Sequence, residues 1–255
     1  MVPSFSLEGR VAVVTGAGRG LGQAIAIALA EAGANLCVTG RSEVGLQETA
    51  GKIEELGRRC SVAAQDVVDL STIDPVLERF RSIHGKIDIL VNNAGMEKVS
   101  PSFDVDEALW DQIVSTNLKG AFFWSRAVGK VMAEQGAGGS ILNMCSLTSY
   151  VGVPTAVPYG SSKSGLLGMT KALASEWAPH GIRVNALAPG YFRTAMTEVF
   201  YEDESWQDKM LDKIPQRRFG QDSDVGGAAI FLCSDAAAYI TGHCIPIDGG
   251  YLASI

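Results

Sequence analysis

Short apolar runs alternate with longer helix-forming stretches along most of the chain, and this alternation constrains the fold more than any other feature. The first run, at residues 11–15, is rich in valine, and the following stretch, 21–32, is rich in alanine, isoleucine and leucine. Further strands are expected at residues 35–39, 60–65, 87–91, 140–144, 183–187 and 244–247, and further helices at 43–56, 70–83, 106–134, 159–177 and 224–233. The alternation predicts a parallel sheet covered by helices on both faces and joined by right-handed crossovers.

The first apolar run leads directly into a glycine-rich turn, Thr15-Gly16-Ala17-Gly18-Arg19-Gly20-Leu21-Gly22. Glycines allow a tight bend and a close approach of backbone to phosphate, and the amides that begin the next helix point toward that anion. A glycine turn between a strand and a helix therefore predicts a dinucleotide site. The residues of this turn that are expected to bind the cofactor are Gly16, Arg19, Gly20, Leu21 and Gly22.

No proline-rich or serine-rich linker and no internal repeat divides the 255 residues. The expected fold is therefore α/β: a single doubly wound Rossmann-type domain over residues 1–255, with a mainly seven-stranded parallel sheet and helices on both faces.

The end of the second expected strand selects the dinucleotide. A site that prefers NAD usually carries an acid there, about 20 residues beyond the turn, which accepts a hydrogen bond from the ribose 2′-hydroxyl. This chain has Gly40-Arg41-Ser42 instead. Because a guanidinium binds phosphate through charge-assisted hydrogen bonds, Arg41 and Arg19 are expected to bind a 2′-phosphate, with Ser42 beside them. The predicted cofactor is NADP(H) in preference to NAD(H).

Ser146, Tyr159 and Lys163 are the candidate chemical groups. Tyr159 and Lys163 are four positions apart, so on a helix they share one face. A phenol has a pKa near 10, and a nearby ammonium is expected to lower that pKa by stabilising the phenolate. Tyr159 can then exchange a proton with an alcohol or alkoxide, while Ser146, after the fifth strand, holds the substrate oxygen. With the glycine turn, this set predicts an enzyme that transfers hydride between nicotinamide and a carbonyl or alcohol carbon.

With these motifs the chain resembles the short-chain dehydrogenase/reductase family over nearly all of its length. The matching pieces occur in the family's order: Thr15-Gly16-x-x-x-Gly20-x-Gly22, Asp66, Asn92-Asn93-Ala94-Gly95, Asn117, Ser146, Tyr159-x-x-x-Lys163, Pro189-Gly190 and Thr194. The resemblance implies a homotetramer that assembles through the two long helices and the C-terminal region.

The resemblance also implies individual roles. Asp66 would bind the adenine amino group, Lys163 the nicotinamide ribose, and Phe192 and Thr194 the carboxamide, while Asn117 would bend a helix and hold a water that relays protons to Lys163. The implied cofactor-binding residues are Asp66, Val67, Asn93, Ala94, Gly95, Tyr159, Lys163, Pro189, Gly190, Phe192 and Thr194, and the implied catalytic residues are Asn117, Ser146, Tyr159 and Lys163. Without the resemblance, Asp66 can equally be the N-cap of a following helix.

Residues 191–218 interrupt the alternation and carry aromatic side chains among many charges. Because ligands bind beyond the carboxyl ends of parallel strands, this segment predicts a substrate lid, with an ordinary pair of surface helices as the alternative. The residues expected to contact substrate are Met96, Lys98, Tyr150, Val153, Arg193 and Trp206.

Residues 143–146, 188–198 and 214–220 are similar to gluconate 5-dehydrogenases and related sugar-acid or polyol dehydrogenases, so a substrate of that class is expected. Lys98, Arg193 and Arg217 are candidate anchors for its carboxylate. A 3-oxoacyl-carrier-protein reductase shares every motif, although the six acids and one base of residues 198–212 disfavour an acidic carrier. A broad ketone reductase with an apolar pocket also stays open, whereas a non-catalytic dinucleotide-binding regulator is expected to lack part of Ser-Tyr-Lys.

Charge and composition exclude other classes. The net charge of −7 opposes a nucleic-acid footprint, which is normally basic. No apolar stretch approaches the ~20 residues of a membrane span, and the N-terminus lacks the pattern of a signal peptide. The five cysteines contain no C-x-x-C pair, and the three histidines form no metal motif. We therefore expect a cytoplasmic protein that acts on a small molecule and binds no nucleic acid, membrane or metal.

Overall fold

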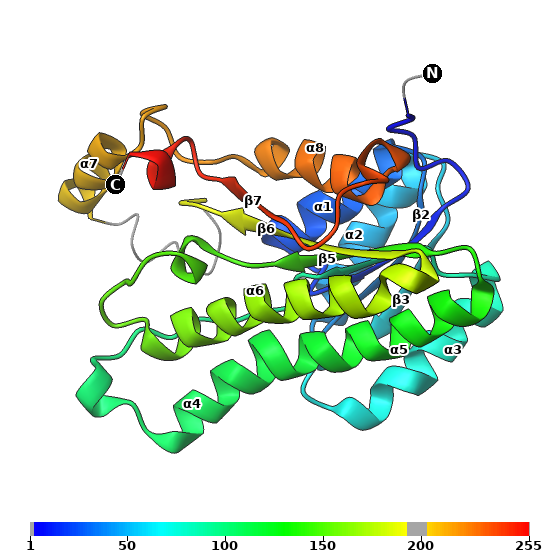
Figure 1. The fold of residues 1–255 in the computed structure, drawn as a ribbon, viewed down its shortest axis with the longest axis horizontal. Coiled ribbons are helices and arrows are strands. Elements are labelled where there is room, and N and C mark those ends of the chain that lie inside the picture. The colour runs from blue at the N-terminus through cyan, green and yellow to red at the C-terminus, as the bar shows by residue number, and fades with distance from the viewer. Residues whose placement is uncertain (1–2, 193–202, 255) are drawn as a thin grey trace.

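The computed structural model describes residues 3–192 and 203–254, which form a seven-stranded sheet (Figure 1). The strands are β1 (Val11–Thr15), β2 (Asn35–Gly40), β3 (Cys60–Ala64), β4 (Ile89–Asn92), β5 (Gly139–Met144), β6 (Ile182–Pro189) and β7 (Cys244–Ile247). All pairings are parallel, in the order β3-β2-β1-β4-β5-β6-β7. The predicted doubly wound α/β fold is confirmed.

The described helices follow the predicted stretches closely. They are α1 (Gly20–Glu31), α2 (Glu43–Glu55), α3 (Ile73–His84), α4 (Glu107–Val114), α5 (Gly120–Gln135), α6 (Val157–Trp177), α7 (Glu204–Lys213) and α8 (Asp222–Cys233). Helix α3 illustrates why: Ile73, Leu77 and Phe80 recur at helical spacing and are buried, and Gly85 ends the helix with a left-handed φ of 80°. None of the described helices is both long and apolar enough to cross a membrane.

The helix predicted over 106–134 is not continuous. A π-helical turn, Ser115–Lys119, separates α4 from α5. Asn117 on this turn is buried, and α5 begins at Gly120, where an added Cβ would lie 2.8 Å from the backbone oxygen of Val67. The π turn and the glycine together bring this helix close to the loop after β3.

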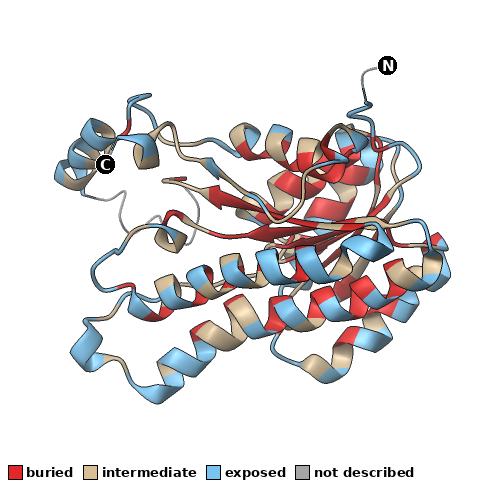
Figure 2. Ribbon diagram, viewed as in Figure 1, coloured by how far each residue is buried: buried red, intermediate tan, exposed pale blue. Residues whose placement is uncertain are grey.

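The helices form two layers, with α1, α2 and α8 on one face of the sheet and α3, α5 and α6 on the other (Figures 1 and 2). Successive residues of β1 point into opposite layers: Ala12 and Val14 join the first core, and Val11 and Val13 join the second. Because helices cover both faces of the sheet, every residue of β1 is buried. All of them are apolar except the last, Thr15.

The order of strands reverses next to β1. After β1 the chain proceeds outward to β2 and β3, then returns to place β4 on the other side of β1. The loops that follow β1 and β4 therefore diverge at the carboxyl edge of the sheet. A crevice at such a point is where ligands bind in open α/β sheets.

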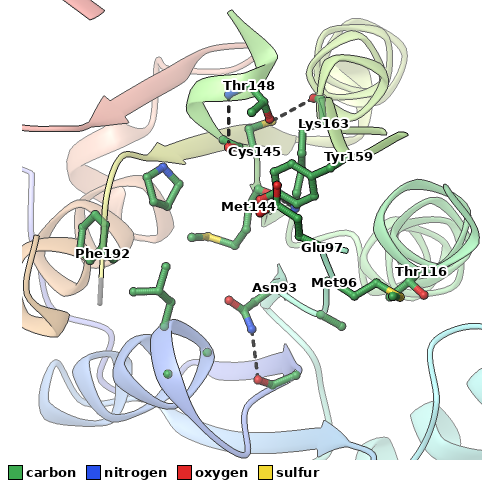
Figure 3. Close-up of a pocket in the computed structure, with 18 of the residues that line it drawn as sticks. Asn93, Met96, Glu97, Thr116, Met144, Cys145, Thr148, Tyr159, Lys163 and Phe192 are labelled. Carbon is green, nitrogen blue, oxygen red and sulfur yellow. Dashed lines mark hydrogen bonds between the residues drawn. The ribbon is translucent and has the colours of Figure 1, made fainter. Parts of the chain in front are cut away.

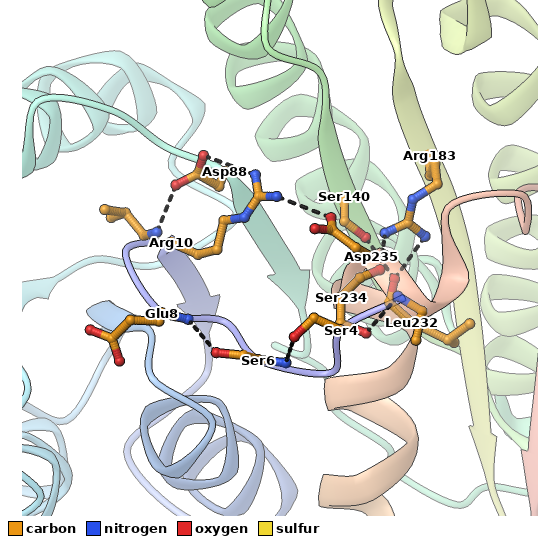
Figure 4. Close-up of polar contacts among 12 residues, drawn as sticks. Ser4, Ser6, Glu8, Arg10, Asp88, Ser140, Arg183, Leu232, Ser234 and Asp235 are labelled. Carbon is orange, nitrogen blue, oxygen red and sulfur yellow. Dashed lines mark hydrogen bonds and ion pairs between the residues drawn. The ribbon is translucent and has the colours of Figure 1, made fainter. Parts of the chain in front are cut away.

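The opposite edge carries a structural polar network (Figure 4). The buried Asp88 accepts from the backbone amide of Val11 at 2.8 Å, and its partners Arg10 and Lys86 lie at 3.7 and 3.0 Å. Arg183, at the start of β6, donates to the backbone oxygens of Leu232, Ser234 and Ile240 at 2.8, 3.2 and 3.4 Å. A cation on these carbonyls complements the negative C-terminal end of α8.

Candidate active site

A cavity of about 800 Å³ lies at the carboxyl edge of the sheet. Among the predicted residues, it is lined by Gly16, Arg19, Gly20, Leu21, Gly22, Arg41, Ser42, Asp66, Val67, Asn93, Ala94, Gly95, Met96, Ser146, Val153, Tyr159, Lys163, Pro189, Gly190, Phe192 and Trp206. The motifs found separately in the sequence therefore face one space, with the glycine turn at one end and the Ser-Tyr-Lys group at the other.

The glycine turn is held by the residues that follow β4. Gly16 has a left-handed φ of 66°, and a Cβ there would lie 2.8 Å from Cα of Ala94. Asn93 donates from Nδ2 to the backbone oxygens of Thr15 and Gly16, both at 3.1 Å, and a Cβ on Gly22 would overlap that amide. The sequence assigned Asn93 to the cofactor, and the structure adds that its side chain shapes the turn.

The start of α1 fits an anionic group. Its N-cap, Arg19, is extended and makes no side-chain capping hydrogen bond, and no acid lies in the first turn. Gly20, Leu21 and Gly22 line the cavity at this end. Uncapped amides and the positive end of the helix dipole are the groups that hold a pyrophosphate, so these residues fit a dinucleotide.

Arg19 and Arg41 are exposed side chains at the rim of the same end. Within the described residues, neither guanidinium forms an ion pair. Ser42 accepts from the amide of Gly45 at 3.3 Å and so caps α2. Two unpaired cations beside an uncapped helix give this end of the cavity a positive charge.

Asp66 lies in the loop after β3 and accepts from the amide of Val68 at 3.2 Å. It does not cap the following helix, because Asp69 is the N-cap there. The alternative reading of Asp66 as a helix cap is therefore wrong. Val67 is buried beside it and packs against Gly120.

Asn117 is engaged with the loop after β4. Its Oδ1 accepts from the amide of Met96 at 2.8 Å, and its Nδ2 donates to the oxygen of Met96 at 2.9 Å and to Oγ of Ser162 at 3.1 Å. These bonds tie the π turn to Met96 and to α6. Asn117 does not itself line the cavity, but a Cβ on Gly95 would lie 3.4 Å from its Oδ1 and 3.6 Å from Nζ of Lys163.

Tyr159 and Lys163 lie beside each other at the other end of the cavity (Figure 3), and Ser146 lines the same cavity. Ser146 follows β5, where its Oγ accepts from the amide of Thr148 at 3.2 Å. Lys163 is buried on α6 and donates from Nζ to the oxygen of Met144 at 2.6 Å. Its Nζ lies 5.6 Å from the centroid of the Tyr159 ring.

The electrostatics of this group differ from the sequence expectation. Burial raises the pKa of Tyr159, the Glu97 carboxylate raises it further, and the hydrogen bond with Ser146 opposes them. Burial also lowers the pKa of Lys163, to about 8. The expected lowering of the Tyr159 pKa by Lys163 is therefore not found in the protein alone. The buried phenol is held in its protonated form.

The predicted substrate residues divide into three groups. Met96, Val153 and Trp206 line the cavity. Lys98 and Tyr150 do not: both are exposed, and Tyr150 hydrogen-bonds with Cys244 instead. Arg193 and the cofactor candidate Thr194 lie outside the described residues. Arg217, a third candidate anchor, forms an ion pair with Asp212 and does not line the cavity.

Glu97 is a cavity residue that the sequence analysis missed. It lies in the loop after β4, one position before the predicted Lys98, and lines the cavity beside Tyr159 and Lys163 (Figure 3). The sequence carried a signal for it, because Glu97 is an acid two positions after the Asn92-Asn93-Ala94-Gly95 motif that was assigned to the site.

Comparisons with known proteins agree with this geometry. A family profile described as Enoyl-(Acyl carrier protein) reductase matches residues 16–252. The 2-dehydro-3-deoxy-D-gluconate 5-dehydrogenase of Escherichia coli K12 is 42% identical over 253 residues, 99% of each chain.

Two solved structures superpose on nearly the whole chain. One is of a Sinorhizobium meliloti 1021 protein assigned as a short-chain alcohol dehydrogenase, with 68% identity, a TM-score of 0.96, and 99% of this chain and 100% of that chain covered. The other is of a gluconate 5-dehydrogenase from Burkholderia cenocepacia J2315 in complex with NADP and tartrate. It has 35% identity, a TM-score of 0.95, and coverage of 100% of this chain and 99% of that chain.

Proposed function

The chain belongs to the short-chain dehydrogenase/reductase family of NAD(P)-dependent oxidoreductases, and we propose that it interconverts a secondary alcohol and a ketone of a sugar acid or polyol. The observation that carries this proposal is the shared cavity, with an uncapped helix start and two arginines at one end and Ser146, Tyr159 and Lys163 at the other. The relatives named as gluconate and 2-dehydro-3-deoxy-gluconate dehydrogenases support the substrate class.

Each catalytic group has a distinct role in the proposed reaction. The bound cofactor supplies or accepts the hydride at nicotinamide C4. Ser146 donates a hydrogen bond to the substrate oxygen, and Tyr159 donates the proton in reduction or accepts it in oxidation. Lys163 stabilises the phenolate that forms, and Asn117 keeps the π turn in place for a water that returns the proton. Burial raises the pKa of Tyr159, which keeps the phenol in the protonated form from which it donates and makes it a weaker acid.

The cofactor proposed is NADP(H) in preference to NAD(H). Arg19 and Arg41 line the cavity where a 2′-phosphate would lie, and β2 ends without an acid. The NADP in the complex of the Burkholderia relative supports this choice. Asp66, Val67, Asn93 and the other cavity residues expected from the sequence complete the proposed binding site.

We also propose that residues 191–218 form a lid on a single domain. Phe192 and Gly220 form a parallel bridge, so the segment leaves and rejoins the fold at one place. Within it, Trp206 on α7 packs against Tyr191, with ring centroids 5.7 Å apart, and lines the cavity. Residues 193–202 of this segment lie outside the described part of the chain.

The first test replaces the proposed proton donor. Tyr159→Phe keeps the ring and removes the hydroxyl, so kcat should fall by about 10²–10⁴-fold while NADPH binding, followed by its fluorescence, persists. The assay follows absorbance at 340 nm with gluconate, 5-ketogluconate, 2-dehydro-3-deoxygluconate, neutral polyols, a 3-oxoacyl thioester and aryl ketones. Tyr239→Phe, at a fully exposed phenol, is the matched control.

The outcome separates the substrate classes. Turnover of sugar acids or polyols that disappears in Tyr159→Phe supports the proposal. Preference for the 3-oxoacyl thioester or for aryl ketones would replace the substrate class and keep the chemistry. Undiminished turnover in Tyr159→Phe would refute the acid/base assignment.

A second test addresses the choice of cofactor. Arg41→Asp removes a phosphate partner and adds a charge that repels phosphate. The KM for NADP(H) should therefore rise about 10–100-fold, while the KM for NAD(H) should not rise. Arg79→Asp, on the exposed side of α3, makes the same charge change away from the cavity and should alter neither constant. Equal effects of Arg41→Asp on both cofactors would contradict the assignment.

A further inference from the structure

Glu97 is an acid at the reacting end of the cavity that the proposed mechanism does not use. It follows Gly95, the residue whose Cβ would lie 3.6 Å from Nζ of Lys163. Figure 3 draws its side chain beside those of Tyr159 and Lys163, and it lines the same cavity. It is partly buried.

The electrostatic effects agree with this location. Burial raises the pKa of Glu97, and Lys163 opposes that rise. In turn, Glu97 contributes to the raised pKa of Tyr159 and opposes the lowering of the Lys163 pKa. These effects agree with the place of Glu97 beside Tyr159 and Lys163 in the cavity.

The Glu97 carboxylate is unpartnered within the described part of the chain. None of the hydrogen bonds or ion pairs there involves it, and Nζ of Lys163 donates to Met144 instead. A carboxylate at a cavity wall accepts hydrogen bonds and offers none when ionised. The chemistry that satisfies it is a hydroxyl group on the substrate.

The described residues bring few cations to this end of the cavity. Among the described residues, Lys163 is the cation that lines the cavity near Ser146 and Tyr159, whereas Arg19 and Arg41 line the opposite end. Lys98 is exposed outside the cavity, and Arg217 is paired with Asp212. A substrate carboxylate next to the reacting carbon would therefore meet the like charge of Glu97, which disfavours its binding.

We propose that Glu97 determines specificity by accepting a hydrogen bond from a substrate hydroxyl on the carbon next to the reacting one. The preferred substrate is then a vicinal diol or its α-hydroxy ketone, with any carboxylate remote from the reacting carbon. This inference rests on the proposed function and narrows its substrate class. It disfavours 2-hydroxy acids, and it disfavours simple secondary alcohols because they leave the carboxylate without a partner.

The test compares matched substrates in matched variants. The best polyol or sugar acid from the panel is assayed beside its analogues that lack one hydroxyl next to the reacting carbon. The wild-type kcat/KM should fall at least about 100-fold for one such deoxy analogue, because a site built around a hydroxyl rejects the analogue without it. Glu97→Ala should reduce this ratio to below about threefold, and Glu97→Gln, which keeps an acceptor oxygen, should give an intermediate ratio.

The ratio isolates the proposed contact. A change in the Tyr159 pKa alters every substrate alike, so it cancels between the hydroxylated substrate and its analogue. Val99→Ala, at a cavity residue on the same loop, is the control and should keep the wild-type ratio. If Glu97→Ala lowers kcat/KM equally for both substrates, so that their ratio stays unchanged, the inference is overturned. Absence of any turnover in the wild-type protein would instead refute the proposed function.

Discussion

Lys163 is a buried cation whose charge opposes folding at neutral pH. Within the described part of the chain its Nζ has one hydrogen-bond partner, the oxygen of Met144, and burial lowers its pKa from 10.5 to about 8. Between these values the unfolded chain holds a proton that the folded chain has released. Stability from this group therefore rises with pH through the window of about 8 to 10.5, and is lowest below it.

This titration can be measured against a variant that lacks it. Lys163→Met removes the charge and leaves the oxygen of Met144 without its donor, a cost that does not depend on pH. As the pH rises from 7 to 10.5, the unfolding free energy of the wild type should therefore increase relative to that of Lys163→Met, by up to about 3 kcal/mol. Urea denaturation of both proteins across this range checks it, since other groups titrate alike in both. A difference that is constant with pH would contradict the prediction.

At this scale the sequence predicted which residues meet but not their electrostatics. Ser146, Tyr159 and Lys163 face one cavity as expected from their spacing. The raised pKa of Tyr159 depends on burial and on Glu97, and both are consequences of tertiary packing that residue spacing does not encode. The sequence also predicted the exposed Lys98 as a substrate residue instead of its neighbour Glu97. The direction of side chains on a loop follows no periodic pattern, so the sequence could not distinguish the two.

The C-terminal end of helix α8 is capped by a residue that lies far away in sequence. Arg183 donates to the oxygens of Leu232 and Ser234, and Oγ of Ser140 also donates to Leu232, at 3.0 Å. These carbonyls would otherwise be buried without donors. The contact joins β5, β6 and α8 at the edge opposite the cavity (Figure 4).

Removal of this cap should affect stability rather than catalysis. Arg183→Met should lower the unfolding free energy by about 2–4 kcal/mol, because charge-assisted bonds to partly buried carbonyls are lost. Arg81→Met, which breaks an exposed pair with Glu78 on α3, should cost less than about 1 kcal/mol. Denaturant titration measures both, and kcat at 20 °C should be unchanged in each. A loss of turnover without loss of stability would contradict the structural role.

Helix and strand positions were largely predictable because apolar periodicity reports the buried faces. The π turn at Ser115–Lys119 was not predictable from periodicity, since one extra residue in a turn leaves the pattern on either side intact. What selects it is a set of distant contacts: Asn117 with Met96 and Ser162, and Gly120 with Val67. The resemblance to a family implied a bend at Asn117, and the described helix has its irregular turn there.

At the scale of the whole molecule, the homotetramer implied by the resemblance stays a prediction. Long helices on one layer carry exposed apolar side chains, among them Phe122 on α5 and Val157 on α6. Light scattering after gel filtration should give the mass of four chains. Phe122→Glu should shift the distribution to smaller species without loss of helical circular dichroism, because a charge in an apolar interface is costly. Val44→Glu, the same kind of change on α2, should leave the tetramer intact. A monomeric wild-type protein would refute the prediction.

The overall architecture was the most predictable level. Seven apolar runs separated by helices leave few arrangements once crossovers are right-handed, and the observed strand order is one of them. The ends of the segment 191–218 were less predictable, since their bridge joins Phe192 to a residue outside that segment, Gly220. A ring that packs on a glycine leaves no periodic signal: a Cβ on Gly220 would lie 2.6 Å from the Phe192 ring.

That bridge places the two described ends of the segment beside each other. Phe192 pairs with Gly220 next to β6 and β7, and the amide of Gln216 donates to the oxygen of Gly249 at 3.1 Å, so both described ends of the stretch are anchored to the fold. On the proposed lid, an exchange of the stretch between these anchors for that of a related enzyme is therefore expected to change substrate preference and to leave cofactor binding intact.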